Sequence, residues 1–126
     1  MTTTPLISQD ELGALFSGLR AVLTVADEGG RIVFLNDLAL AYYGDQGGEA
    51  LIGTHLDGCH NPASQDKIKR LYARYRAGDL TPTRYCEEEG DGTAEYIVLI
   101  PLVVAGQFRG VAELVWTERP ELVLEL

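Results

Sequence analysis

Four large apolar side chains recur near the start of the chain at positions i, i+3, i+4 and i+7, a spacing that places them on one face of a helix. They are Leu12, Leu15, Phe16 and Leu19. Ser8 and Glu11, at the beginning of this segment, have the spacing of a helix capping box. The pattern predicts an amphipathic N-terminal helix over residues 8–19.

Beyond this helix, strand-like apolar runs alternate with short helical segments. The runs are rich in Val, Ile, Leu and Phe and are bounded by glycine-containing turns, which is typical of strands. Asn36 and Ser64 each precede a helical segment that a glycine ends, so both are expected to be N-caps. Pro101 predicts a bulge or a bend in its strand. The predicted strands span 20–26, 31–35, 83–88, 95–104 and 108–116, and the predicted helices span 37–43 and 64–77.

This order of elements predicts an α+β fold. A five-stranded antiparallel sheet, with short helices and one longer helix on one face and an N-terminal amphipathic helix, satisfies the order. We therefore divide the chain into an N-terminal helical extension (1–19), one domain (20–118) and a C-terminal tail (119–126). Both faces of the strand over 96–104 are apolar, yet the helices cover only one face of the sheet. We expect a homodimer with the N-terminal helix at or near the interface.

Composition and charge narrow the class of protein. The 126 residues, 46% of them hydrophobic, suit one soluble globular domain. A formal net charge of -9 argues against nucleic acid and anionic membranes as partners. Two cysteines are too few for a disulfide framework, and the chain shows neither a signal peptide nor a membrane-spanning run. A cytoplasmic location is expected.

Three segments, in this order, resemble the PAS domain family. Residues 26–32 followed by Asn36 resemble the family's first hairpin and the Asn before its first core helix. Gly44 and then residues 49–56, which contain Leu-Ile-Gly, resemble its next segment. Residues 106–113 resemble its last hairpin, with a glycine early in the final strand. The resemblance covers about 20–115 and implies a PAS fold and a non-catalytic sensory or signalling module that binds a small molecule or a protein partner.

Two further features relate to this resemblance. The run Cys59, His60, Asn61 and Pro62 resembles a subgroup with a Cys-His-x-Pro turn before the long helix, although Asn61 stands where relatives carry proline. Many PAS domains continue through an Asp-Ile-Thr-like signature into a helical linker and an effector domain. This chain instead ends soon after Trp116, so we expect a stand-alone module.

The predicted long helix and the last three strands would enclose the candidate pocket. Aromatic hydroxyls above an apolar floor are a common composition of ligand sites. A core filled by the same side chains is an equally good interpretation, with the hydroxyls reaching water. The candidate pocket residues are His60, Cys59, Tyr72, Tyr75, Tyr85, Ile97 and Leu99.

The chemistry of Cys59 and His60 leaves alternatives open. Side chains that are neighbours in sequence diverge, which argues against a thiolate and its base, so we predict a structural Cys59 and a His60 that borders the pocket. The resemblance also allows haem, with His60 or His55 as axial ligand and Cys59 as an alternative. Zinc is disfavoured because His55, Cys59, His60 and Cys86 lack paired ligand spacing.

An enzyme on a similarly curved sheet is the remaining alternative. It would need a buried Asp or Glu in the cavity, whereas the acidic residues fall mostly in turns and at helix ends. Five basic residues crowd the predicted helix over 64–77, and an acidic hairpin follows it. We expect these charges to pair within the chain or across subunits rather than to bind phosphate or RNA.

Overall fold

The protein is described by a computed structural model that covers residues 8–118. The C-terminal tail predicted for 119–126 and the first seven residues of the predicted helical extension lie outside the described residues. The helices are α1 (Gln9–Ser17), α2 (Asp37–Tyr42) and α3 (Pro62–Arg76), with short 3-10 turns η1 (Gly44–Gln46), η2 (Gly48–Leu51) and η3 (Leu56–Cys59). The strands are β1 (Val22–Asp27), β2 (Ile32–Leu35), β3 (Thr83–Glu88), β4 (Ala94–Val104) and β5 (Gln107–Glu118).

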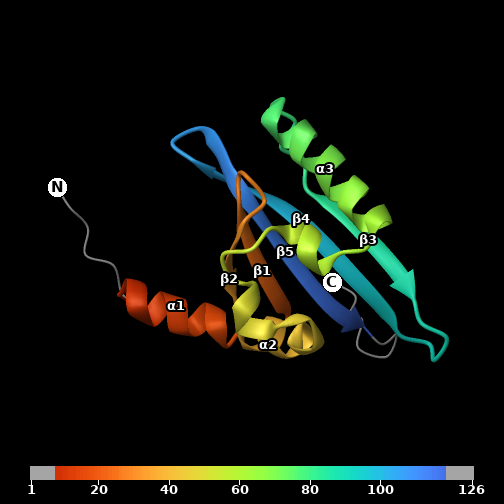
Figure 1. The fold of residues 1–126 in the computed structure, drawn as a ribbon. Helices are drawn as coiled ribbons and strands as arrows, with labels where there is room; N and C mark the ends of the chain where they lie inside the picture. The colour runs from red at the N-terminus through yellow and green to blue at the C-terminus, as the bar shows by residue number, and fades with distance from the viewer. Residues whose placement is uncertain (1–7, 119–126) are drawn as a thin grey trace, which may run out of the picture.

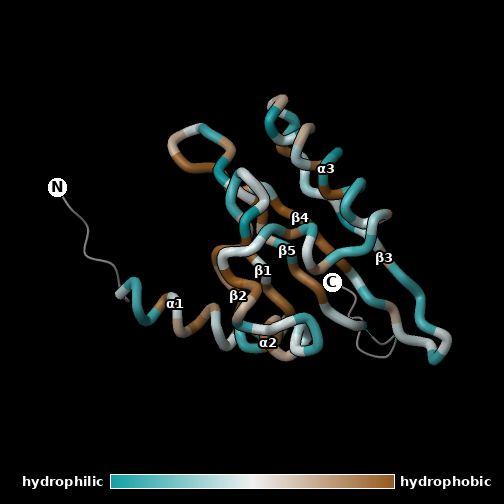
Figure 2. Tube along the Cα trace, in the orientation of Figure 1, coloured by the Kyte–Doolittle hydropathy of each residue, from teal (hydrophilic) through white to brown (hydrophobic). Residues whose placement is uncertain are grey.

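The five strands form one antiparallel sheet in the order β2-β1-β5-β4-β3. Helices α2 and α3 lie on the same side of the sheet, while α1 extends away from its lower end (Figure 1). Hydrophobic residues are most continuous in the central strands, and α3 alternates between hydrophilic and hydrophobic residues (Figure 2). The predicted α+β architecture is therefore confirmed. No helix within residues 8–118 is long and apolar enough to cross a membrane.

The core lies between the sheet and the helices that cover it. Ile32 and Ala39 are fully buried, and the apolar stripe of α3 faces the same core. Gly110 of β5 lies so close to β1 that a Cβ there would collide with the Ala26 carbonyl, so only glycine fits. This contact gives a physical reason for the glycine early in the final strand.

Asn36 joins the first hairpin to α2. Its side-chain oxygen accepts hydrogen bonds from the amides of Leu23 and Ala39, each at 3.0 Å. Its side-chain nitrogen donates to the carbonyls of Leu19 at 3.1 Å and Ala21 at 2.8 Å. The side chain is fully buried with all four bonds made, so the predicted N-cap also fixes the entry of the chain into β1.

Two local expectations differ from the structure. The long helix is capped by Asn61, whose side chain accepts from the Ser64 amide at 2.9 Å, and not by Ser64. Pro62 is the reason, because its fixed φ suits the first helical position and starts the helix three residues earlier than a Ser64 cap would. The irregularity that Pro101 predicts lies one step further along, between Leu102 and Val103.

The second face of the sheet is largely apolar and only partly covered. Its outward positions alternate with the core-facing ones, and they are half-buried at Val25, Val98, Ile100, Leu102, Leu114 and Trp116. Helix α1 begins at the predicted Ser8 capping box, yet none of its residues is buried. Leu15 is 62% exposed and Phe16 is 46% exposed. The apolar stripe of α1 is therefore available to a further surface.

Candidate ligand pocket

A cavity of about 420 Å³ lies between the helices and the core-facing side of the sheet. Its floor is formed by β3, β4 and β5, and its roof by α2, η1, the end of η3 and the first turns of α3. The size falls within the range of about 300–1,000 Å³ that is common for small-molecule sites.

Five of the seven candidate residues predicted from the sequence line this cavity: Cys59, His60, Tyr85, Ile97 and Leu99. Tyr72 and Tyr75 do not line it and belong to the packed core. The Tyr72 hydroxyl donates to the Asp27 carbonyl at 3.0 Å, and the Tyr75 hydroxyl donates to the Leu99 carbonyl at 3.2 Å. These two side chains therefore fill the core, but their hydroxyls bind backbone carbonyls rather than reach water. Whether the other five contact a ligand stays a prediction.

A buried carboxylate that the sequence reasoning missed lies in the cavity. Glu113 of β5 is only 9% exposed and stands opposite Leu99 in the sheet. It follows Val111 and precedes Val115 with strand periodicity, and both valines are buried. The sequence feature that could have identified Glu113 is therefore a glutamate at a core-facing position of an apolar strand. Glu113 is thus an exception to the acidic residues that fall mostly in turns and at helix ends, and it supplies the buried carboxylate that an enzyme would need.

Glu113 forms a small polar network with the roof. The Tyr43 hydroxyl donates to one carboxylate oxygen at 3.1 Å, and the His60 Nε2 lies 3.9 Å from the other. On the opposite side of the ring, His60 Nδ1 lies 2.8 Å from the Leu56 carbonyl and 3.2 Å from Cys59 Sγ. Because a carbonyl oxygen only accepts, Nδ1 carries a hydrogen and donates to Leu56.

This network changes the titration of its members. Burial alone lowers the pKa of His60, but contacts with Cys59, the Glu113 carboxylate and the Leu56 carbonyl outweigh burial and raise the pKa to about 10. Burial, followed by the Glu113 charge, raises the pKa of Tyr43 far above its usual value. His60 is therefore charged at neutral pH, and Tyr43 stays a neutral donor to Glu113.

The expectation that the side chains of Cys59 and His60 diverge is wrong, because the Cys59 Sγ lies 3.2 Å from the His60 Nδ1. The Nδ1 hydrogen faces the Leu56 carbonyl, and the Cys59 thiol, 3.3 Å from the same carbonyl, donates to it as well. The two side chains close the turn before α3 and form part of the cavity wall.

His55 lies away from the cavity. Its Nδ1 accepts from the Asp57 amide at 3.0 Å, and its ring packs over Gly30, where φ is +84°. No group of three or more potential metal ligands occurs within residues 8–118. Haem does not fit the residues present either, because the His60 Nε2 faces Glu113 and two more carboxylates line the cavity. Those charges oppose both an apolar macrocycle and its anionic propionates.

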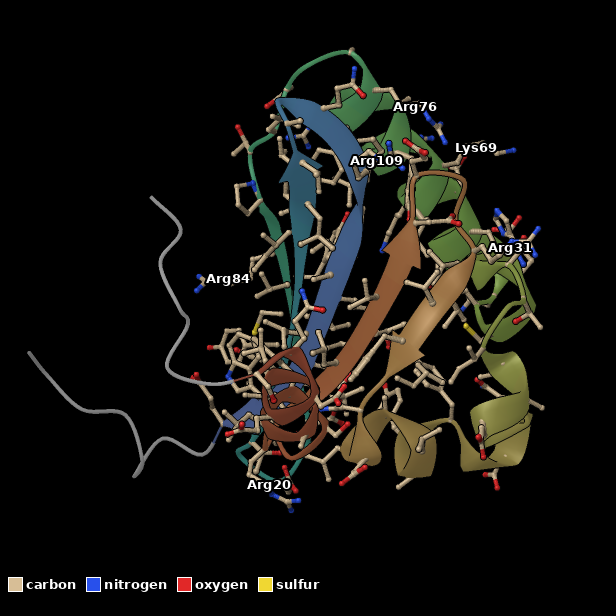
Figure 3. The ribbon with its side chains drawn as sticks, turned by 90° about the vertical axis from the view of Figure 1, so that its left-hand side faces the viewer. Arg20, Arg31, Lys69, Arg76, Arg84 and Arg109 are labelled. Atoms are coloured by element: carbon tan, nitrogen blue, oxygen red, sulfur yellow. The ribbon has the colours of Figure 1, made fainter. Side chains whose placement is uncertain are left out.

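Two of the five basic side chains of α3 form ion pairs within the chain, and a third binds a backbone carbonyl. Arg70 lies 2.8 Å from Asp66, Arg74 lies 3.3 Å from Asp79, and Arg76 donates to the Glu28 carbonyl at 2.7 Å. Lys69 and Arg76 lie on the side of the helices, whereas Arg84 points to the other side of the sheet (Figure 3). Pairing within the chain is therefore observed for Arg70 and Arg74, with partners in α3 and just after it rather than in the acidic hairpin.

Comparison with solved structures shows which fold this is. The C-terminal domain of a Streptococcus mutans protein superimposes with a TM-score of 0.75 and 21% identity, covering 95% of each chain. The PAS domain of BvgS from Bordetella pertussis has a TM-score of 0.64 and 22% identity, covering 90% of this chain and 89% of that one. A sensory box sensor histidine kinase from Vibrio cholerae has a TM-score of 0.60 and 18% identity, covering 88% and 91%.

The chain therefore has a PAS fold, as the sequence resemblance indicates. No family model matches the chain. No curated protein matches it either. The subgroup with the Cys-His-x-Pro turn stays a prediction.

Proposed function

We propose that this protein is a PAS-type sensory or signalling module that binds a small molecule in its pocket and catalyses no reaction. The cavity of about 420 Å³ carries this proposal, because it combines an apolar floor with the polar groups of Glu113, His60 and Tyr43. That combination suits recognition of a ligand by shape and by a few directed bonds. The similarity in fold to a sensor histidine kinase supports a role in signalling.

The signal would leave through a protein interface on the other face of the sheet. That face is apolar, only half-buried, and continuous with the exposed stripe of α1. A groove between them is lined by Leu12 and Phe16 of α1 and by Val25, Phe34 and Leu102 of the sheet. We assign this surface to a homodimer, because a second copy offers the same apolar face in return. The two free cysteines suit a reducing compartment such as the cytoplasm.

A small enzyme is the second candidate, since Glu113 supplies the buried carboxylate that such an enzyme needs. The carboxylate is, however, already bound by Tyr43 and faces a charged His60. A general base needs a free acceptor within reach of the substrate. The observed contacts therefore favour binding over catalysis.

Mass spectrometry of molecules released from the freshly purified protein tests the ligand proposal, with an absorbance spectrum beside it. We expect a released small molecule and no haem absorbance band. Ile97→Phe, which enlarges a side chain of the cavity floor, should lose at least about nine-tenths of the bound molecule. Val33→Phe is the matched control, because Val33 is 50% exposed and lies on β2 outside the cavity. Equal ligand content in both variants would contradict the proposal.

A further inference from the structure

One end of the cavity carries two carboxylates without a cationic partner. Glu87 of β3 and Glu95 of β4 stand directly opposite each other in the antiparallel register, and both line the cavity. No Lys, Arg or His side chain within residues 8–118 lies within 4.0 Å of either carboxylate. Like charges at directly opposite positions destabilise a sheet unless a charge of the opposite sign lies beside them.

The surroundings of Glu95 increase this repulsion. Its side chain is half-buried, and burial, followed by the charges of Glu89, Glu87 and Glu113, raises its pKa. Glu87 is exposed, so water screens part of this repulsion, and a bound cation would relieve the rest. The overall charge of -9 also draws cations toward the molecule.

Aromatic and apolar surfaces adjoin the two carboxylates. Tyr42 lies at the cavity rim with its ring half-exposed, and burial, followed by Glu95, raises its pKa. Tyr85, Ile97 and Val115 form the next row of the floor, as the strand register places them side by side. An aromatic ring attracts a cation at its face, and the apolar row suits a hydrocarbon body.

A further polar atom lies unpartnered behind the inner end of the cavity. Thr24 stands opposite Glu113 in the sheet, is 1% exposed, and its Oγ1 has no hydrogen-bond partner. It faces a void of about 10 Å³ that shares Ile68, Leu99 and Glu113 with the larger cavity. That space is close to the size of one water molecule, and it adjoins Glu113 rather than Glu87 and Glu95.

We propose that the pocket selects a small organic cation, an amine whose charged head sits between Glu87 and Glu95 and whose apolar body lies along Tyr85, Ile97 and Val115. This inference rests on the proposed function of ligand binding and names the chemical class of the ligand. His60 neutralises Glu113 at the inner end, so the unpaired negative charge remains at the Glu87 and Glu95 end. Lys67, whose Nζ lies 5.4 Å from the centre of the Tyr85 ring, is the one cationic side chain besides His60 among the described lining residues.

Three probes with the same phenyl group and different charges test the inference: 2-phenylethylamine, 2-phenylethanol and 3-phenylpropionate. Each is titrated at pH 7 into the full chain, and amide NMR shifts report where it binds. We expect the amine to shift the signals of Ile97 and Val115 and to bind about tenfold or more tightly than the alcohol or the carboxylate.

Two matched variants separate the effect of a carboxylate in the cavity from the effect of the protein's overall negative charge. Glu95→Gln should weaken amine binding about tenfold, and it folds well because it removes a repulsion. Glu88→Gln makes the same change on the opposite face of β3 and should leave the affinity within about twofold. Equal effects of the two variants would overturn the inference.

The outcomes also distinguish this inference from the proposed function. Tighter binding of the alcohol or the carboxylate in the cavity would overturn the cation assignment and leave the sensory module intact. If 3-phenylpropionate binds the wild type and loses affinity in Lys67→Gln, the cavity is an anion site instead. If none of the probes shifts cavity signals, the amine assignment fails, and the released-molecule analysis then decides the proposed function by itself.

Discussion

His60 is the single residue through which pH acts most directly on the pocket wall. Its pKa is raised from 6.5 to about 10 in the folded chain, so its protonation stabilises the folded state relative to the unfolded one. This stabilisation is fully present below about pH 6.5 and is lost as pH rises to about 10. We predict that the free energy of unfolding falls over this window by at most about 1.4 kcal/mol per pH unit.

Urea unfolding between pH 6.5 and 9.5 measures this dependence. His60→Gln should flatten the decline, because it removes the titrating group, and should cost about 2 kcal/mol at pH 6.5 by leaving Glu113 less well paired. His55→Gln is the control, since His55 is exposed and lies away from the cavity. Parallel curves for the wild type and His60→Gln would show that His60 is not the group responsible.

The hairpin of β4 and β5 shows how a single turn affects a whole element. Val104 pairs with Gln107, so Ala105 and Gly106 form a two-residue loop, with φ of 51° and 77°. A type I′ loop needs positive φ at both positions, and alanine pays a steric penalty there that asparagine largely avoids. We predict that Ala105→Asn raises the free energy of unfolding by about 0.5–1 kcal/mol.

Thermal or urea unfolding of the variant tests this prediction. Gly106→Ala serves as the opposite control and should lower the stability by about 1 kcal/mol, because it introduces a Cβ at positive φ. If Ala105→Asn were no more stable than the wild type, the loop would not store the strain that its dihedral angles indicate.

At the scale of the whole molecule, the apolar outer face of the sheet and the stripe of α1 bear on assembly. We predict that the protein sediments at twice its chain mass of 13.7 kDa at micromolar concentration. Leu15→Glu should weaken the dimer at least about tenfold, because it places a charge in the apolar interface. Analytical ultracentrifugation over a concentration series measures both.

Ala14→Glu is the matched control, since Ala14 is exposed and lies on the face of α1 opposite the apolar stripe. It should leave the dimer unchanged. A wild-type chain that is a monomer throughout the series, unaffected by removal of residues 1–18, would contradict the assembly we propose.

Much of the fold follows from the sequence because its signals are local. The strand over 83–88 begins and ends where alternation and turn residues predict, and α2 begins after Asn36 as its N-cap predicts. The boundary of α3 was shifted because Pro62 acts more strongly on the first turn than Ser64 does. Of the candidate site, five residues reach the cavity, and Tyr72 and Tyr75 do not.

The elements, their order and the antiparallel sheet can be predicted from local patterns, since periodicity, capping and turn residues act within a few positions of one another. The position of the cavity, in contrast, depends on how the helices pack against the sheet. Tyr75 lies in the core with its hydroxyl on the Leu99 carbonyl, whereas Tyr85 and Ile97, further along the same face of the sheet, line the cavity. Likewise, Glu113 meets Tyr43 and His60 only because the strand register and helix packing bring together residues 70 and 53 positions apart. Such contacts depend on the summed packing of distant segments, which no local pattern encodes.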